Sequence, residues 1–523
     1  MKPTLLFTAF AVVFCLPVTA QQYFYPDPTF STDGYVIPSY PGNDRGNDLV
    51  LQPDGKILTA GIGSTGGIVS RFLANGSPDV SFGNGGLVSF QFGTGSNTLN
   101  AIALQADGKI VVAGGFSTKI GVARLLPNGA LDPTFGTAGK AVANIDNNSA
   151  ATAVVIDADG KIIVTSQSKV SGSTDTRTAV FRFLPNGVLD PSFSNDGIAV
   201  VNILPDTTFY LETANAVLID HTTGRIIVGG WAYDTTNIGF ALYRLLDNGD
   251  LDPAFGNGGI VRSFGNEIFD LVQQPDGKII AAGYTGDNLL ENDIVLTRYL
   301  PNGELDTSFG AGGVVITDFG YVEANGVALQ PDGKIVIAGF YYQCTLIFFC
   351  DYNFIIGRYN PDGSVDTTFR ASGFFTASIG EDEELHKVLV QPNGDILAVG
   401  YYDNSLDEDD MVLIRLTDSL PPTANLYANF ANGCWPLSVH FDDLSTGNPT
   451  SWLWSFPGGT PSTSTERNPT VVYNQPGIYA VTLTVSNSLG SDSHTVSDIV
   501  TVNTAPTADF TYTANGNEVA FMN

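Results

Sequence analysis

Short stretches of alternating apolar and polar residues follow one another along most of the chain, and tight-turn dipeptides separate them. Such stretches lie on both sides of Asp107-Gly108 within residues 100–115, and again around Asn128-Gly129 within residues 120–142. Alternation with a period of two predicts half-buried β-strands, and Asp-Gly and Asn-Gly are well suited to tight hairpin turns. Each unit of this kind is therefore predicted to form four short antiparallel strands.

This unit recurs seven times at a mean spacing of about 56 residues. The copies align on one glycine of the first turn, which is Gly55, Gly108, Gly160, Gly224, Gly277, Gly333 and Gly394. Repeated units of four strands are the signature of a β-propeller. Seven copies predict an all-β, seven-bladed propeller of four-stranded blades.

The two ends of the repeat region complement each other. Residues 27–36 match only the last part of a unit, whereas the seventh unit stops at residues 414–420 without that part. The N-terminal segment is therefore predicted to complete the seventh blade, which would close the ring and leave no free sheet edge.

The stretch RLLPNGALDPTFG, residues 124–136, contains an Arg and an Asp on either side of a turn. If Asn128-Gly129 forms a two-residue turn, Leu125 faces Asp132, and Arg124 is its diagonal neighbour within reach of a long side chain. Because a catalytic group is needed once, a pair that recurs in every copy indicates a structural role. The predicted structural blade pairs are Arg71 with Asp79, Arg124 with Asp132, Arg182 with Asp190, Arg244 with Asp252, Arg298 with Asp306, and Arg358 with Asp366. The Phe after each Asp is predicted to anchor the core of its blade.

These residues resemble the delta-60 repeat family, a bacterial propeller-like repeat. The resemblance is carried by residues 124–136, by RFLPNGVLDPSFS at 182–194, by RLLDNGDLDPAFG at 244–256 and by RYLPNGELDTSFG at 298–310. It covers roughly residues 27 to 418, and the sixth copy departs from it with RYNPDGSVDTTFR. The resemblance implies a fold, and no activity is generally attached to the repeat.

A second kind of unit follows the repeats. Residues 419–422 (SLPP) read as a linker after the propeller region 21–418, and residues 423–503 show short alternating strands typical of a small β-sandwich. Trp452 and Trp454 before Phe456, together with Pro469, Tyr473, Gly477 and Tyr479, make this region resemble a PKD domain, although WSFPGG replaces the usual W-x-F-G-D-G turn. The same pattern restarts at residues 504–523, which predicts the start of a second, truncated PKD-like domain.

The N-terminus and the charge predict an exported protein. Residues 1–20 have a Lys, an apolar run and a Val-Thr-Ala ending, which is the pattern of a cleaved signal peptide, and no later segment is apolar enough for a transmembrane span. The net charge of −30 would repel nucleic acid and anionic lipid surfaces. We therefore expect a secreted protein, extracellular or on the outer cell surface, that binds no nucleic acid.

The repeat also predicts where a binding site should lie. The turns between strands 1 and 2 and between strands 3 and 4 are short and monotonous and share one face, here called the turn face. The links on the opposite, variable face differ greatly, and functional residues concentrate in such loops. Aromatic residues predicted to bind a ligand there are Phe116, Trp231, Tyr233, Tyr284, Tyr341, Tyr342, Tyr401 and Tyr402. They suit stacking on sugar rings, but packing between blades is the reading that we favour for them.

Two further features are weaker. Asp403, Asp407, Asp409 and Asp410 could bind a structural calcium ion, although they lack EF-hand spacing and a charge run of this kind is usually a solvated loop. Cys344 and Cys350 flank five residues and could form a disulfide in an oxidising compartment. No other cofactor is expected.

The chain contains no H-E-x-x-H, G-x-S-x-G or P-loop motif. We therefore expect a non-enzymatic binding or adhesion protein, with the propeller recognising a polysaccharide or a surface protein and the PKD-like modules acting as spacers. The alternative is a carbohydrate-active enzyme, a lyase or hydrolase, with carboxylates on the variable face. Two carboxylates with an Arg or Tyr in one pocket there would favour the enzyme. A purely architectural propeller is the third possibility.

Overall fold

The computed structural model describes most of the chain from residue 24 onward, in two compact units, residues 1–417 and 418–523. The described residues are 24–38, 40, 42–145, 147–169, 175–204, 210–234, 238–288, 291–346, 349–370, 372–404, 408–417, 422–429, 431–447, 449–487, 490–504, 511–515 and 518–522. The predicted signal peptide, residues 1–20, lies outside them. Within the described residues, no helix is long and apolar enough to cross a membrane.

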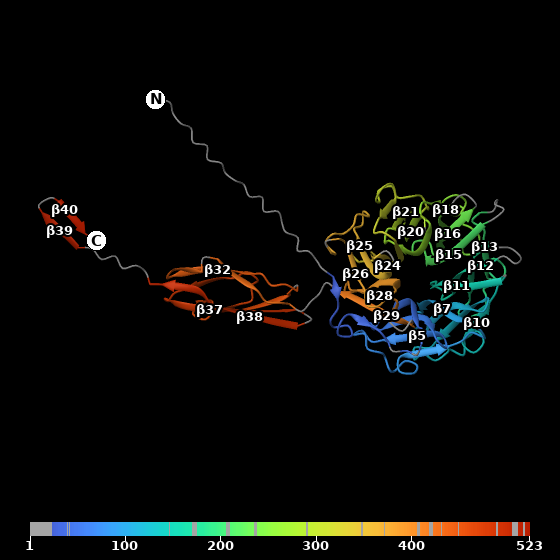
Figure 1. The fold of residues 1–523 in the computed structure, drawn as a ribbon, viewed down its shortest axis with the longest axis horizontal. Helices are drawn as coiled ribbons and strands as arrows, with labels where there is room; N and C mark the ends of the chain where they lie inside the picture. The colour runs from blue at the N-terminus through green and yellow to red at the C-terminus, as the bar shows by residue number, and fades with distance from the viewer. Residues whose placement is uncertain are drawn as a thin grey trace, which may run out of the picture. The chain divides into compact units, whose positions relative to one another are not determined.

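Seven antiparallel sheets form a ring in the first unit (Figure 1), so the predicted all-β, seven-bladed propeller is confirmed. Blade 1 consists of β3 (Arg45–Leu51), β4 (Ile57–Gly63), β5 (Gly66–Phe72) and β6 (Leu87–Phe90), and blade 2 of β7 (Asn97–Leu104), β8 (Ile110–Phe116), β9 (Lys119–Leu125) and β10 (Lys140–Ala143). Blade 3 consists of β11 (Asn147–Ile156), β12 (Ile162–Lys169), β13 (Thr176–Phe183) and β14 (Ile198–Val201), and blade 4 of β15 (Tyr210–Ile219), β16 (Ile226–Asp234), β17 (Ile238–Leu245) and β18 (Ile260–Ser263).

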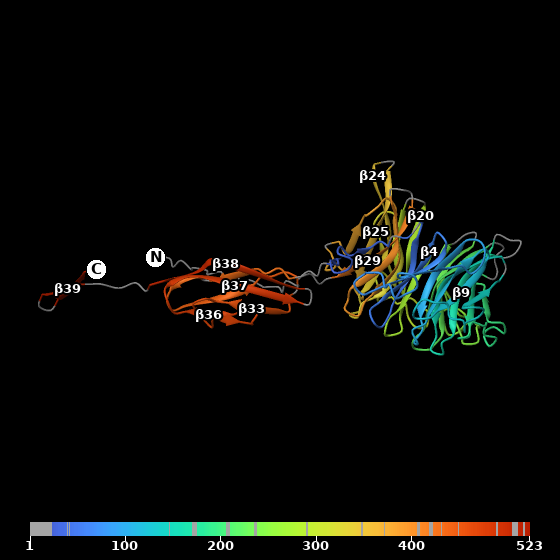
Figure 2. The ribbon, with the colours of Figure 1, turned by 90° about the horizontal axis from the view of Figure 1, so that it is seen from below.

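The remaining three blades follow the same order. Blade 5 consists of β19 (Glu267–Gln273), β20 (Ile279–Asn288), β21 (Glu291–Tyr299) and β22 (Val314–Thr317), and blade 6 of β23 (Val322–Leu329), β24 (Ile335–Leu346), β25 (Phe349–Tyr359) and β26 (Phe374–Ala377). Blade 7 consists of β27 (Glu383–Val390), β28 (Ile396–Asn404) and β29 (Glu408–Thr417), with β1 (Tyr25–Pro26) and β2 (Tyr35–Val36). In the side view, β24 of blade 6 reaches beyond the other labelled strands of the propeller (Figure 2).

The N-terminal segment completes blade 7, as predicted. Tyr25 pairs with Thr417 and Tyr35 pairs with Ile414, so both β1 and β2 add to the outer side of β29. The last blade is thus built from both ends of the repeat region, and this pairing closes the ring.

The recurring Arg is buried and makes the same contacts in successive blades. Arg124 Nε donates to Asp132 Oδ2 at 2.9 Å, its guanidinium lies 4.9 Å from the centre of the Phe135 ring, and its Nη1 donates to the carbonyl of Pro185 in the next blade. The other five predicted blade pairs have Nε–Oδ2 distances of 2.7–2.9 Å. A seventh pair that sequence analysis did not name joins Arg415 to Asp27 at 2.7 Å. The Arg therefore links its own hairpin to the neighbouring blade.

The lysine of the first turn also reaches the paired Asp. Lys334 Nζ lies 3.0 Å from Asp366 Oδ2, and the lysines at the same position in four other blades lie 3.3–3.9 Å from theirs. Burial alone would raise the pKa of Asp366, but hydrogen bonds from Thr368 and Lys334 and the charge of Arg358 lower it to about 2. The Asp therefore stays ionised and holds two cations and two strands together.

The register predicted for this hairpin is wrong by one residue. Leu126 N donates to the Ala130 carbonyl, so the loop has three residues, and Arg124 lies directly opposite Asp132 rather than diagonal to it. The reason is the loop type, because Pro127 begins a turn that Gly129 ends at a φ of +91°, a conformation that glycine adopts readily. The segment after the turn contributes a single bridge, Leu125 to Leu131, and the fourth strand follows later, at 140–143.

A second ring of contacts surrounds the central channel, which the first strands of the blades line. Each of these strands has a β-bulge at the same position, and the bulged residues are Asn47, Asn100, Thr152, Asn215, Phe269, Asn325 and His386. Six of them hydrogen-bond to a backbone carbonyl of the next blade; Asn47 Nδ2, for example, donates to Leu99 O at 2.8 Å. Phe269 carries no polar group that could do so.

Three carboxylates are buried where chain segments enter the first strands, at Asp44, Glu212 and Glu383. Asp44 Oδ1 accepts a hydrogen bond from Met411 N at 2.9 Å, while Oδ2 has no hydrogen-bond partner among the described residues. Burial, and to a lesser extent Asp410 and Asp409, raise the pKa of Asp44 to about 7. This carboxyl group is therefore largely neutral in the folded protein below that pH.

The PKD-like region is a sandwich of two sheets with its own core. One sheet has the order β30-β32-β36-β34 and the other β31-β38-β37-β33-β35. Trp454 stacks on Phe456 at 5.6 Å and both are buried, while Trp452 Nε1 donates to Asp443 Oδ2 at 2.9 Å. The strands are β30 (Leu426–Asn429), β31 (Asn432–Cys434), β32 (Leu437–Asp443), β33 (Ser451–Ser455), β34 (Gly459–Thr460), β35 (Thr463–Ser464), β36 (Thr470–Tyr473), β37 (Gly477–Asn487) and β38 (Gly490–Asn503). Residues 504–523 contain one hairpin, of β39 (Thr511–Asn515) and β40 (Glu518–Met522).

We predict that Arg124→Met lowers the free energy of unfolding by about 3–5 kcal/mol, because it leaves the buried Asp132 without its main partner. Chemical denaturation followed by tryptophan and tyrosine fluorescence measures the change. Lys119→Met at the exposed start of the same strand is the control. Equal, small losses of unfolding free energy in both variants would contradict a structural role of this ion pair.

We also predict that Asp44→Asn stabilises the protein at pH 8 relative to wild type by about 1–3 kcal/mol, and much less at pH 5. The pKa of Asp44 is about 7 in the folded protein and about 4 in the unfolded chain. The contribution of Asp44 to the stability of the wild type therefore falls as the pH rises from about 4 to above 7. An amide should be tolerated, because Asn97 occupies the equivalent place in blade 2 and its Oδ1 accepts from Phe92 N at 2.8 Å. Denaturation midpoints at both pH values test this, and a pH-independent difference would refute it.

Candidate functional site

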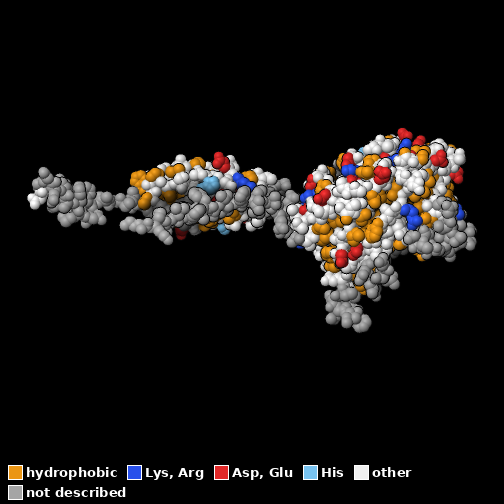
Figure 3. Space-filling view, turned by 90° about the horizontal axis from the view of Figure 1, so that it is seen from above, with side chains coloured by type: hydrophobic (Ala, Val, Ile, Leu, Met, Phe, Trp, Pro, Cys, Tyr) orange, Lys and Arg blue, Asp and Glu red, His pale blue; other side chains and the backbone are white. Residues whose placement is uncertain are grey.

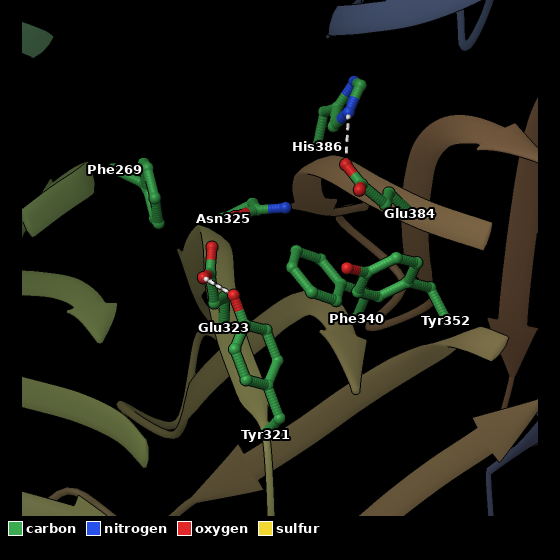
Figure 4. Close-up of a pocket in the computed structure, with 8 residues that line it drawn as sticks. All are labelled: Phe269, Tyr321, Glu323, Asn325, Phe340, Tyr352, Glu384 and His386. Carbon is green, nitrogen blue, oxygen red and sulfur yellow. Dashed lines mark hydrogen bonds and ion pairs between the residues drawn. The ribbon is translucent and has the colours of Figure 1, made fainter. Parts of the chain in front are cut away.

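A cavity of about 550 Å³ opens at the variable-face end of the first strands of blades 5, 6 and 7. We call it the acidic pocket. It is lined by Phe269, Tyr321, Glu323, Asn325, Phe340, Tyr352, Glu384 and His386 (Figure 4). Strands β19, β23 and β27 supply the residues nearest the channel, and β24 and β25 supply Phe340 and Tyr352.

Glu323 is the more enclosed carboxylate of the pocket. Its Oε1 accepts a hydrogen bond from Asn292 Nδ2 at 2.8 Å and a longer one from the Tyr321 hydroxyl at 3.4 Å (Figure 4). Burial, and then the charges of Glu267 and Glu384, raise the pKa of Glu323 to about 7. Near neutral pH this group therefore exists in both its protonated and its ionised form.

Glu384 and His386 form a second polar pair on β27. His386 Nδ1 lies 2.9 Å from the Gly46 carbonyl, and because a carbonyl only accepts, this nitrogen carries a hydrogen. The other ring nitrogen, Nε2, lies 3.4 Å from Glu384 Oε2 (Figure 4). With a proton on Nε2, this contact is a salt bridge.

Aromatic rings form the walls of the pocket. Phe340 and Tyr352 meet edge to face with their centroids 5.0 Å apart, and Tyr352 in turn contacts Tyr342 at 5.1 Å. Across the opening, Phe269 stacks on Tyr284 at 5.7 Å. Since Phe269 stands where most blades have a polar bulge residue, the boundary between blades 5 and 6 lacks that hydrogen bond and presents an apolar ring instead.

The acidic character of the pocket follows a regular placement. Glu267, Glu323 and Glu384 occupy the same position on the first strands of three consecutive blades, ten residues before the aligned glycine of each copy. Each glutamate lies directly across its hairpin from an aromatic residue of the second strand, and the pairs are Glu267 with Tyr284, Glu323 with Phe340 and Glu384 with Tyr401. Blade 1 has Arg45 at the same position.

The central channel below the pocket contains a separate charged group. Lys387 Nζ lies 2.7 Å from Asp270 Oδ1, and the charges of Asp270 and Asp48 outweigh burial and raise the pKa of Lys387. Asp270 Oδ2 also accepts from Val327 N at 2.9 Å, and Asp48 Oδ2 from Ile102 N at 2.9 Å. These contacts involve five blades, which indicates a structural role.

The eight aromatic residues predicted from sequence lie behind the pocket or away from it, and none is among its described lining residues. Tyr284, Tyr342 and Tyr401 form a second layer, in contact with Phe269, Tyr352 and His386 respectively. Elsewhere, Phe116 packs on Phe92, Trp231 donates to Glu267, Tyr341 packs on Phe319, and Tyr233 and Tyr402 are half-buried. Their role as ligand contacts stays a prediction.

The calcium and disulfide predictions fall partly outside the described residues. Asp407 is not described, and Asp409 is engaged by Arg45 at 2.7 Å. Over the described ranges, no group of three or more His, Cys, Asp or Glu side chains is placed to hold a metal ion. The backbones of Cys344 and Cys350 are partners in the β24–β25 ladder, and their side chains lie outside the described residues.

Sequence analysis missed the first-strand residues Glu323, Asn325, Glu384 and His386. The signal was present, because a glutamate stands ten residues before the aligned glycine in the fifth, sixth and seventh copies. Four copies have another residue there, so the glutamate disappears from a consensus of the repeat. Neighbouring copies that share a departure from the consensus would have indicated the site.

Comparison with known families agrees with this architecture. Six segments match the family model described as a domain of unknown function (DUF5122) beta-propeller, and they are residues 52–82, 105–135, 158–193, 222–255, 274–309 and 330–369. Residues 420–502 match the PKD domain. Each matched propeller segment lies in a copy that runs unbroken from its first turn to its Asp-x-x-Phe segment, whereas blade 7 is divided between the two ends of the repeat region.

Curated relatives are similar over short regions. The chain is 35% identical over 111 residues to the pre-pro-metalloprotease PrtV of Vibrio cholerae serotype O1, which is 20% of this chain and 12% of that protein. It is 46% identical over 59 residues to the collagenase ColA of Bacillus cereus, which is 11% of this chain and 6% of that protein. The chain thus spans a small part of the length of these relatives.

Solved structures are similar at low identity. The polysaccharide lyase Uly1 is 11% identical, with 76% of this chain and 98% of that chain covered and a TM-score of 0.44. A streptogramin B lyase is 12% identical, with 76% and 99% covered and a TM-score of 0.39. On the family matches and the observed sheets, the chain belongs to the proteins that carry DUF5122 β-propeller repeats, here followed by a PKD domain.

Proposed function

We propose that the protein is an exported glycan-binding protein and that the acidic pocket holds a short stretch of a polysaccharide. The observation that carries this proposal is the combination of aromatic walls with carboxylate and amide groups in one cavity of about 550 Å³. Ligand pockets in proteins have about this size, and they combine apolar walls with a few directed polar groups.

The chemistry of a sugar suits this lining. The apolar face of a sugar ring packs on rings such as those of Phe269 and Tyr352, while its hydroxyl groups donate to carboxylates and exchange hydrogen bonds with an amide. Glu323 and Asn325 on β23 and Glu384 on β27 supply those polar groups from two strands of the rigid frame. Such a site selects a ligand by the direction of its hydroxyl groups.

Features outside the pocket support an extracellular role. The predicted signal peptide and the PKD domain both fit export, and the PKD domain would act as a spacer. On the side shown in Figure 3, Asp and Glu side chains lie interspersed with Lys and Arg over the propeller surface. The acidic pocket itself has two carboxylates and no Lys or Arg among its described lining residues.

Glycan cleavage is the second candidate function, and one observation favours it. The pocket combines two carboxylates with tyrosines, and burial with two neighbouring glutamates raises the pKa of Glu323 to about 7. A carboxylic acid that keeps its proton near neutral pH can act as a general acid, with Glu384 as the second carboxylate. Two carboxylates with a Tyr in one pocket is the arrangement expected above for an enzyme. Binding is proposed first because the aromatic walls and the Asn325 amide serve binding without any further group.

We predict that Glu323→Gln weakens polysaccharide binding at least about tenfold, because the ionised carboxylate accepts hydrogen bonds more strongly than an amide. A glycan array followed by isothermal titration calorimetry with residues 21–418 measures the change. Glu304→Gln is the matched control, since Glu304 is exposed on the turn face of blade 5. Equal affinity of both variants for the same glycan would show that the ligand does not bind in this pocket.

A cleavage assay decides between the two candidates. If the protein only binds, incubation of each bound polysaccharide releases no reducing ends and no unsaturated products above the buffer background. Product release that Glu323→Gln and Glu384→Gln both abolish, and that Glu304→Gln leaves unchanged, would establish an enzyme instead.

A further inference from the structure

The acidic pocket has an unbalanced charge. It is lined by two carboxylates, Glu323 and Glu384, with a third at Glu267 close enough to raise the pKa of Glu323. His386 is the one described lining residue that can carry positive charge, and it lies beside Glu384. Two other cations of the same blades and of blade 1 are already paired, Arg45 with Asp409 and Lys387 with Asp270, each at 2.7 Å.

The protein itself places a cation against one of the three glutamate–aromatic pairs. The guanidinium of Arg45, from blade 1, lies 4.0 Å above the centre of the Tyr401 ring, which faces Glu384 across the hairpin of blade 7. The hydrogen bond to Asp409 and the charges of Asp409 and Glu384 raise the pKa of Arg45 against the effect of burial. A cation between an aromatic face and a carboxylate is therefore stable in this frame.

The equivalent pairs of blades 5 and 6 have no such internal cation. By the ring order, the residue that corresponds to Arg45 is Glu323 for the blade 5 pair and Glu384 for the blade 6 pair. Among the described residues, no Arg or Lys lies over the ring of Tyr284 or Phe340. At the blade 7 pair, the position over the aromatic ring is filled by the cation Arg45. At the pairs of blades 5 and 6, the corresponding residues are carboxylates beside the pocket.

We infer that the ligand of the acidic pocket carries a positive charge and that, given the proposed glycan-binding function, it is a glycan with free amino groups. The ammonium group would lie between the carboxylates and the ring faces. Arg45 makes contacts of the same two kinds at the blade 7 pair, with the ring of Tyr401 and the carboxylate of Asp409. An N-acetylated sugar lacks this charge, and a uronate carries the opposite charge. The pocket should therefore rank these three ligands by charge.

Isothermal titration calorimetry with three oligosaccharides of equal length, made of glucosamine, N-acetylglucosamine and galacturonate, tests this inference at about pH 6.5. We expect the glucosamine oligomer to bind at least about tenfold more tightly than the N-acetylated one, and its affinity to fall with added salt. Glu323→Gln should reduce this preference, while the turn-face control Glu304→Gln should keep it.

A variant that adds a positive charge to the pocket gives a second test. Glu384→Arg introduces a guanidinium at the position of Arg45, next to the Phe340 pair, and should abolish the preference for the amine while thermal melting shows that the propeller still folds. Equal binding of the acetylated and the amine oligomer would overturn the inference and leave the glycan-binding function standing. Failure of all three oligomers to bind would overturn both.

Discussion

The structure of the propeller depends on one buried ion pair that is repeated around the ring. Its Arg binds the Asp of its own hairpin, covers the Phe that anchors the blade and donates to a backbone carbonyl of the next blade. A buried charge is stable only when its partners satisfy it on all sides, so the pair fixes the position of the hairpin and of the neighbouring blade at once. Because its carbonyl contact is made with the next blade, the pair also ties successive sheets together.

The point where the ring closes shows what the repeated contact requires. Arg358 of blade 6 cannot reach a strand 3–4 turn in blade 7, because that blade takes its last strands from the N-terminus. Its Nη1 donates instead to Gln330 Oε1 at 3.2 Å, and the Phe24 ring lies 4.9 Å from its guanidinium. Arg370 then donates to the Phe24 carbonyl at 3.0 Å. The N-terminal segment thus supplies both the missing strand and a replacement for the missing turn.

The fold could be predicted from the sequence because its determinants recur, and the pocket could not because its determinants do not. The turns, the Arg and Asp and the aromatic anchor appear in most copies, so a consensus reading finds them. The hairpin register was wrong at Asp132 because Asn-Gly after a Pro allows both a two-residue and a three-residue loop. The aromatic residues at the strand ends were conspicuous, but three of the eight lie behind Phe269, Tyr352 and His386, and the other five do not line the pocket either.

A rigid repeated frame also explains how three like charges can be held together. Glu267, Glu323 and Glu384 repel one another, and this repulsion adds to burial in raising the pKa of Glu323. The backbone positions of these residues are set by pairs on the turn face and by hydrogen bonds around the channel, so the glutamates cannot move apart. A proton on Glu323 relieves the repulsion in the free protein, and a bound cation relieves it in the complex. Because both act on the same carboxylate, binding of a cation displaces the proton, and linkage then ties affinity for the ligand to the ionisation of Glu323.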